Sequence, residues 1–192
     1  MAKKVKKAKT IDAWKLKKKY EVIAPEIFNN VSLGPIFAKE PENLVGRTVE
    51  TSLSTLVNSN QHHIKVNLMV TGNQGFSATT MVKSVELSRA YVSSQTNPGN
   101  NVIENIFKIK TKDGKHARIK TLMFTRGKAH SDQKKALRKL AEQMINDVSA
   151  SSDYDQMVQE VVFGKLGSLI FGKGKKIAPL GRVEVRKLEL LG

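Results

Sequence analysis

Alternating apolar and polar positions predict several strands in the first half of the chain. Apolar side chains occupy every second position from Ile64 to Val70, which is the period of a half-buried strand. A turn sequence rich in glycine and asparagine follows at 72–75, so residues 76–81 are expected to return as the hairpin partner. Shorter segments at 20–24 and 47–53 predict two further strands.

The pattern is less decisive after this hairpin. Residues 82–94 fit a helix slightly better than a strand, and we predict a helix there. Residues 95–101 contain Asn, Pro and Gly in close succession and predict a loop.

A second hairpin is predicted around Lys112-Asp113-Gly114, between alternating segments at 107–110 and 116–120. A two-residue Asp-Gly turn would place lysines and isoleucines on the same face. A three-residue loop with Gly114 in the left-handed conformation gives one apolar face and one basic face, so we predict this register. Its expected pairs are Lys108 with Arg118, Ile109 with Ala117, and Lys110 with His116.

Apolar residues spaced three and four apart predict two helices after the second hairpin. Ser131 is expected to cap the first helix, and Asp153 with Gln156 resembles the capping box of the second. A basic loop at 172–176 and an alternating strand at 182–186 follow. The order of elements predicts an α+β fold: a mostly antiparallel sheet or barrel-like core with two or three helices toward the C-terminal half, and a basic extended N-terminal arm.

Charge defines that arm. The chain has 192 residues and a formal net charge of +16, and residues 1–19 contain nine lysines against a single acid, Asp12. Such a segment has too little apolar surface to fold alone, so we predict a flexible arm at 1–19 that binds a polyanion, followed by one globular domain at 20–192. Trp14 lies inside this arm, and either stacks on a base or docks the arm onto the domain.

The excess of positive charge continues into the globular part. Between Lys108 and Lys139 there are twelve Lys or Arg residues and two acids, and the basic face of the predicted hairpin carries no acid of its own. Aromatic residues make up only 6% of the chain, which favours recognition of backbone and shape over a base-stacking platform. The candidate RNA-binding residues are Lys3, Lys4, Lys6, Lys7, Lys9, Trp14, Lys15, Lys17, Lys18, Lys19, Arg47, Lys108, Lys110, His116, Arg118, Lys120, Arg126, Lys128, Lys173, Lys175, Lys176, Arg182, Arg186 and Lys187.

Other chemistry is weakly indicated. Residues 167–173 approximate a phosphate-binding P-loop, but Gly174 stands where a Ser or Thr would bind magnesium. The adjacent His62 and His63 would point to opposite faces of a strand, and the chain has no cysteine. We therefore predict no catalytic residues, no cofactor, no metal and no small-molecule substrate. No apolar run approaches the roughly 18–20 residues that span a bilayer, so we expect no membrane association.

Five blocks of sequence, in order, resemble the S-three-A family of archaeal and eukaryotic small-subunit ribosomal proteins, also called S-one of eukaryotic type. They lie at 12–28, 46–53, 110–120, 161–165 and 175–187, and the size of the chain is closer to the archaeal form. The neutral segment 93–101 and Gly181 depart from the basic residues common in the family, and Lys19 stands where a second tryptophan is common.

This resemblance implies a structural protein of the small ribosomal subunit, on the platform near the mRNA exit. Its expected partners are small-subunit rRNA, neighbouring ribosomal proteins and nearby mRNA, and its expected location is the cytoplasmic ribosome. Two alternatives remain open at this stage: an architectural DNA-binding protein, and an RNA-processing enzyme.

Overall fold

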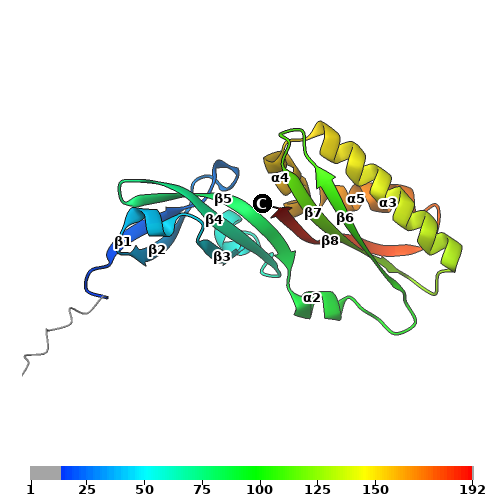
Figure 1. Ribbon diagram of the computed structural model, residues 1–192. Helices are drawn as coiled ribbons and strands as arrows, with labels where there is room; N and C mark the ends of the chain where they lie inside the picture. Colours follow the sequence, from blue (N-terminus) through cyan, green and yellow to red (C-terminus); the bar gives the residue numbers. More distant parts are fainter. Residues whose placement is uncertain (1–13, 192) are drawn as a thin grey trace, which may run out of the picture.

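The computed structural model describes residues 14–191, which form one twisted, mostly antiparallel sheet with helices gathered at one end (Figure 1). The α+β class predicted from the sequence is therefore confirmed. The strands are β1 (Lys18–Ile23), β2 (Ser32–Ala38), β3 (Thr48–Ser52), β4 (Ile64–Gln74), β5 (Ser77–Leu87), β6 (Val102–Lys110), β7 (His116–Thr125) and β8 (Leu180–Leu191).

Strand β5 connects the two parts of the sheet. One edge of β5 pairs with β4 along its whole length, and β4 pairs in turn with β3. The other edge pairs first with β1, in the one parallel ladder of the described residues, and then with β8. The pairing continues from β1 to β2 and from β8 through β7 to β6. Within residues 14–191, β2 and β3 are left as edges, so hydrogen bonds between these strands do not close the N-terminal part into a barrel.

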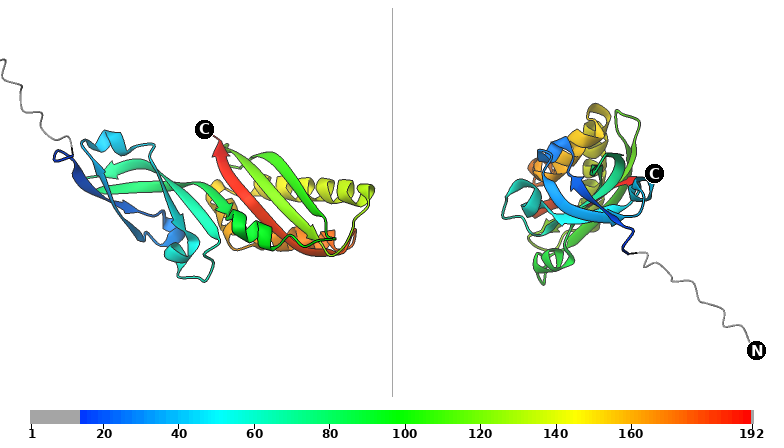
Figure 2. Two further views of the ribbon diagram at one scale, coloured as in Figure 1. Left: turned by 90° about the horizontal axis from the view of Figure 1, so that it is seen from below. Right: turned by 90° about the vertical axis from the view of Figure 1, so that its left-hand side faces the viewer.

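Helices cover one face of the β6–β7–β8 part of the sheet. They are α3 (Ser131–Ser151), α4 (Tyr154–Val162) and α5 (Lys165–Gly174), and Figure 2 shows them on the side of the sheet opposite α2 (Arg89–Ser94). A short helix α1 (Leu53–Val57) and two single 3-10 turns, Glu26–Phe28 and Pro41–Leu44, belong to the N-terminal part. No helix within residues 14–191 combines the length and the apolarity needed to cross a bilayer.

Two apolar clusters stabilise the fold. The larger one joins the inner face of β4–β8 to the helices, with Ile119, Leu137, Ile145 and Met157 fully buried. The smaller one lies under β1 and β2, and consists of Tyr20, Ala38, Leu44, Val70 and Ala78. Burial of apolar surface is the main favourable term in folding, so the larger cluster carries most of the stability.

Three local predictions are wrong. Residues 82–87 continue strand β5, and only 89–94 are helical. The N-cap of α3 is His130 rather than Ser131, and the His130 amide donates to the side-chain oxygen of Gln133 at 3.0 Å. Helix α5 extends to Gly174, so the predicted basic loop at 172–176 is helical in its first half.

Candidate nucleic-acid interface

The β6–β7 hairpin has the predicted register. Lys108 is paired with Arg118, Ile109 with Ala117, and Lys110 with His116. Around the loop, the Thr111 amide donates to the Lys115 carbonyl at 3.0 Å and the Gly114 amide donates to the Thr111 carbonyl at 2.9 Å. Gly114 has φ +77°, the left-handed conformation that a three-residue hairpin loop requires.

This register separates the two faces of the hairpin. Ile109, Ala117 and Ile119 are buried beneath the helices. Lys108, Lys110 and His116 are exposed on the opposite face, and Arg118 and Lys120 are half-buried beside them. We call these five residues the hairpin ladder: Lys108, Lys110, His116, Arg118 and Lys120.

The hairpin ladder is open to a ligand, although the sheet around it is not of one sign. Strand β8 places Glu189 opposite Arg118 and Lys187 opposite Lys120. The basic face therefore continues onto a strand that carries acids, which the hairpin sequence alone did not show. Within residues 14–191, however, no ion pair engages any member of the hairpin ladder.

The candidate cations of β8 are different, because each lies near a carboxylate. Arg186 forms an ion pair with Glu104 at 2.8 Å. The Lys187 ammonium lies 3.7 Å from Glu86 and 3.5 Å from Glu189. These pairs already offset the charge of Arg186 and Lys187, so these two residues are weaker candidates for phosphate binding than the hairpin ladder.

Arg182 belongs to a network that ties α2 to β8. Its guanidinium donates to the Tyr91 hydroxyl at 2.7 Å and lies 3.4 Å from Glu184, and the Tyr91 hydroxyl donates to Glu184 at 2.7 Å. The Tyr91 ring also stacks on His63, with ring centroids 4.0 Å apart. Burial, together with the bond to Glu184, raises the pKa of Tyr91 to about 12. The network is therefore structural: it docks α2 on the sheet.

A separate basic group lies at the far end of the helical part. The Arg126 amide donates to the Pro179 carbonyl at 2.9 Å, which joins the end of β7 to the segment after α5. The Gln133 side chain donates to the Ile177 carbonyl at 3.2 Å, so α3 begins beside the same segment. Five candidate residues are exposed here: Arg126, Lys128, Lys173, Lys175 and Lys176.

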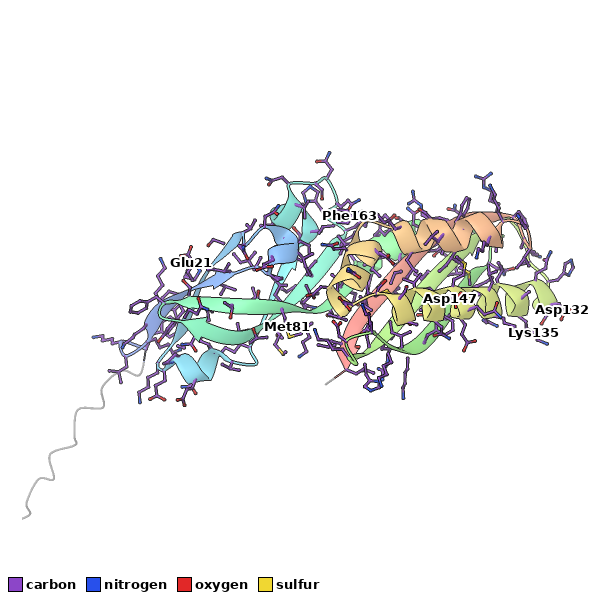
Figure 3. All side chains as sticks on the ribbon, turned by 90° about the horizontal axis from the view of Figure 1, so that it is seen from above. Glu21, Met81, Asp132, Lys135, Asp147 and Phe163 are labelled. Atoms are coloured by element: carbon purple, nitrogen blue, oxygen red, sulfur yellow. The ribbon has the colours of Figure 1, made fainter. Side chains whose placement is uncertain are left out.

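The candidate set omits three exposed cations beside this group: Lys135, Arg138 and Lys139 in the first turns of α3. Figure 3 shows Lys135 and Asp132 at the outer end of that helix. Their spacing on the solvent side of an amphipathic helix is the signal that would have added them.

The remaining described candidates gather at the opposite end of the molecule. Trp14 to Lys19 are exposed, and Lys18 and Lys19 are already part of β1. The Trp14 ring lies 5.9 Å from Phe37, centroid to centroid, and the Lys17 ammonium lies 3.9 Å from the Trp14 ring. Arg47 donates to the Phe37 carbonyl at 3.1 Å. Trp14 therefore docks on β2; candidates Lys3, Lys4, Lys6, Lys7 and Lys9 lie outside the described residues.

Two carboxylates meet at the tip of the hairpin. Asp113 accepts a hydrogen bond from the Tyr154 amide at 3.3 Å, at the start of α4, where Asp153 is the N-cap in the predicted capping box. A hydrogen bond between the two carboxyl groups lowers the pKa of Asp113 and raises the pKa of Asp153. The flanking Lys112 and Lys115 favour the charged form of Asp113. This contact fixes the hairpin tip against α4.

The segment that approximates a P-loop is part of helix α5. A P-loop needs a strand, an open glycine-rich turn and then a helix, so its amides can cradle phosphates. In an α-helix the amides after the first turn are bonded to carbonyls of the preceding turn, and the Ser168 amide already donates to the Gly164 carbonyl at 3.0 Å. Residues 167–173 therefore do not provide this phosphate site.

The fold and its surfaces define an α+β protein whose cations are exposed in three separate groups on one sheet-and-helix scaffold. The chain belongs to the Ribosomal S3Ae family, whose family model matches residues 5–192. This confirms the family resemblance of the five sequence blocks.

Curated relatives agree with this assignment. The chain is 39% identical to the "Small ribosomal subunit protein eS1" of Archaeoglobus fulgidus, over 100% of this chain and 92% of the relative. It is 38% identical to the protein of the same name from Saccharolobus solfataricus, over 94% and 87% of the two chains. The protein of that name from Staphylothermus marinus is 36% identical, over 94% and 85%. These relatives are archaeal, as the size of the chain indicates.

Proposed function

We propose that this chain is a structural protein of the small ribosomal subunit that binds rRNA through its exposed cations. The curated relatives are named as a small-subunit ribosomal protein, and this chain matches nearly their whole length. As a ribosomal protein, the chain would act in the cytoplasm, with rRNA and neighbouring ribosomal proteins as partners. The resemblance also supports a place on the platform near the mRNA exit.

The main observation behind the proposal is that the hairpin ladder makes no ion pair within residues 14–191. Lys108 stands directly across from Arg118 on the solvent face, and neither makes an ion pair within residues 14–191. Like charges in directly opposite positions destabilise a free sheet. A phosphate backbone would supply the ion pairs that Lys108 and Arg118 do not make within residues 14–191.

The mechanism is electrostatic and needs no chemistry on the RNA. Each phosphate that meets a Lys or Arg releases condensed counterions, and their release supplies much of the binding free energy. Because the three cationic groups lie on different parts of the scaffold, they can bind different RNA segments at once. Such contacts neutralise phosphates and hold the RNA segments in a fixed relative orientation.

The test is binding of the pure protein to small-subunit rRNA at increasing salt. If about six to ten phosphates are contacted, the affinity should fall by roughly 10³–10⁵-fold between about 50 and 200 mM salt. A nearly flat titration would contradict the proposal. Equal competition by duplex DNA would favour an architectural DNA-binding protein instead, and turnover of the RNA would favour a processing enzyme.

Incorporation into the particle is the second test. The native protein should sediment with small subunits and be released only by a high-salt wash. Its absence from subunits at low salt would refute the proposed ribosomal role.

A further inference from the structure

Exposed aromatic side chains are concentrated at the N-terminal end of the sheet. All aromatic residues of the chain lie within residues 14–191, and four of them are largely exposed: Trp14 (62%), Phe37 (42%), Phe76 (67%) and Phe163 (58%). The first three belong to the same end of the molecule. The low aromatic content of the whole chain therefore conceals a local concentration.

The strand pairing brings these three rings around Lys19. Lys19 is directly opposite Phe37 in the β1–β2 ladder, and the Phe37 ring is the one that meets Trp14. Phe76 is in the β4–β5 turn, and its carbonyl accepts from the amide of Glu21 at 2.8 Å. Its ring lies 6.0 Å from that of buried Tyr20, centroid to centroid, so one side of Phe76 is supported. We call Trp14, Phe37 and Phe76 the aromatic patch.

A hollow opens beside Phe76. It has a volume of about 290 Å³, and it is lined by Phe76 and Ser77 from β5, Lys19 and Glu21 from β1, and Gly34 and Pro35 from β2. Gly34 has φ +104°, a conformation that strongly favours glycine, so no side chain fills the hollow at this position. A hollow of this volume, with Phe76, Pro35 and Lys19 in its lining, is large enough for a nucleobase ring.

The charge around the aromatic patch identifies its occupant. Exposed apolar side chains that lie together mark an interaction surface. Between residues 14 and 47 the exposed cations are Lys15, Lys17, Lys18, Lys19, Lys39 and Arg47, and the exposed acids are Glu21, Glu26, Glu40 and Glu42. The Glu21 carboxylate is already bonded to the Ser32 hydroxyl at 2.6 Å. Aromatic faces together with an excess of cations suit a ligand with flat rings on an anionic backbone, which is single-stranded nucleic acid.

We propose that the aromatic patch binds unpaired nucleotides of RNA, with one base in the hollow beside Phe76 and others stacked on Phe37 and Trp14. The inference rests on the proposed function for its ligand, and adds a second mode of recognition to it. Duplex phosphates would bind to the hairpin ladder, whereas unpaired bases would bind at the N-terminal end of the sheet.

The sole tryptophan reports on this site directly. Titration with a short single-stranded RNA should quench the emission of Trp14, because a stacked base quenches an indole. Heparin, a polyanion without bases, should bind the same cations without this quenching. Base stacking contributes about 1–3 kcal/mol per base, so Phe76→Ala should weaken single-strand binding by roughly 5- to 150-fold and leave heparin binding unchanged.

Two matched variants complete the experiment. Phe163→Ala removes a ring of similar exposure beside the helices, away from Glu21 and the hollow, and should bind like the wild type (Figure 3). Phe76→Tyr keeps an aromatic face and should retain most of the affinity. Since the Phe76 ring is mostly exposed, the thermal unfolding of all these variants should resemble that of the wild type.

Three results would overturn the inference: Phe76→Ala binds single-stranded RNA like the wild type, Phe76→Ala loses RNA and heparin binding equally, or Trp14 emission ignores single-stranded RNA. A Phe76→Ala variant that binds RNA normally but loses a neighbouring ribosomal protein would assign the aromatic patch to a protein partner instead. Failure of the proposed function is distinguishable, because the wild-type protein would then bind neither single-stranded nor folded RNA in a salt-dependent way.

Discussion

The charges of the hairpin ladder are expected to lower the stability of the free protein and to strengthen its binding to RNA, and both effects can be measured. In the free protein Lys108 faces Arg118 and neither makes an ion pair within residues 14–191, while Lys110 stands two pairs further along, opposite His116. The informative perturbation is the double variant Lys108→Gln and Lys110→Gln. Glutamine keeps most of the length and polarity of lysine and removes only the charge.

The expected magnitudes follow from the geometry. Both lysines are exposed on strand β6, so each can reach one phosphate. Each lost phosphate contact lowers the slope of log affinity against log salt by about 0.9, and the double variant should lower it by about 1.8. Removal of the repulsion between Lys108 and Arg118 should raise the free energy of unfolding by a few tenths of a kcal/mol. The variant should therefore be more stable and bind RNA more weakly.

The assay combines salt titration of rRNA binding with urea unfolding of the free protein. The matched control is Arg186→Gln with Lys187→Gln, which removes the same charge from residues already paired with Glu104, Glu86 and Glu189. The control should change the salt slope less and should lower stability, because it breaks ion pairs. Equal slopes for both double variants, or an unchanged slope for the β6 variant, would refute the reasoning.

Two other predictions concern the scaffold. Gly167→Ala would place a Cβ 2.5 Å from the Val183 carbonyl oxygen, so it should lower the free energy of unfolding by about 1–3 kcal/mol in urea denaturation. The control is Gly172→Ala in the same helix, whose Cβ would meet nothing within 4 Å and which should be neutral or slightly stabilising. The raised pKa of Asp153 stabilises the wild-type fold below the usual value of 3.8, and this contribution is lost as the pH rises through the raised pKa. The stability of Asp153→Asn relative to the wild type should therefore be greater at pH 7 than below pH 3.8, as measured by unfolding at several pH values. An unchanged free energy of unfolding for Gly167→Ala would contradict the first prediction, and a stability difference between Asp153→Asn and the wild type that does not depend on pH would contradict the second. Asparagine is also a good N-cap, and the Asp153→Asn variant keeps Asp113.

The hairpin could be predicted from the sequence because its determinants are local. Alternation on both strands and the glycine at position 114 allow only one register with a clean apolar face. The capping box at Asp153 and Gln156 could be predicted equally well, since its partners are three residues apart.

Strand β5 could not be predicted over its whole length, because its second half depends on distant partners. Val82 and Val85 are buried, Ser84 between them is also buried, and the strand pairs with β4 on one edge and β8 on the other. A strand surrounded in this way loses the simple alternation of a half-buried strand, and its sequence then resembles a helix.

The charge balance of the candidate site was hidden for the same reason. Glu189 is 71 residues from Arg118 in the sequence, and it becomes its neighbour only through the β7–β8 ladder. Phe37 and Phe76 likewise become neighbours of Lys19 only when β2 and the β4–β5 turn meet β1. Sequence reasoning found the cations, but it could not separate the unpaired ones from the paired ones.

The decisive measurement is a density map of the small subunit with this protein in place. If rRNA neutralises these cations, phosphates should lie within hydrogen-bond distance of Lys108, Lys110 and Arg118, and rRNA density should surround the lysines that precede β1. A map in which the outer face of the β6–β7 hairpin and these lysines meet only solvent would contradict the central claim that the exposed cations of this protein are neutralised by rRNA.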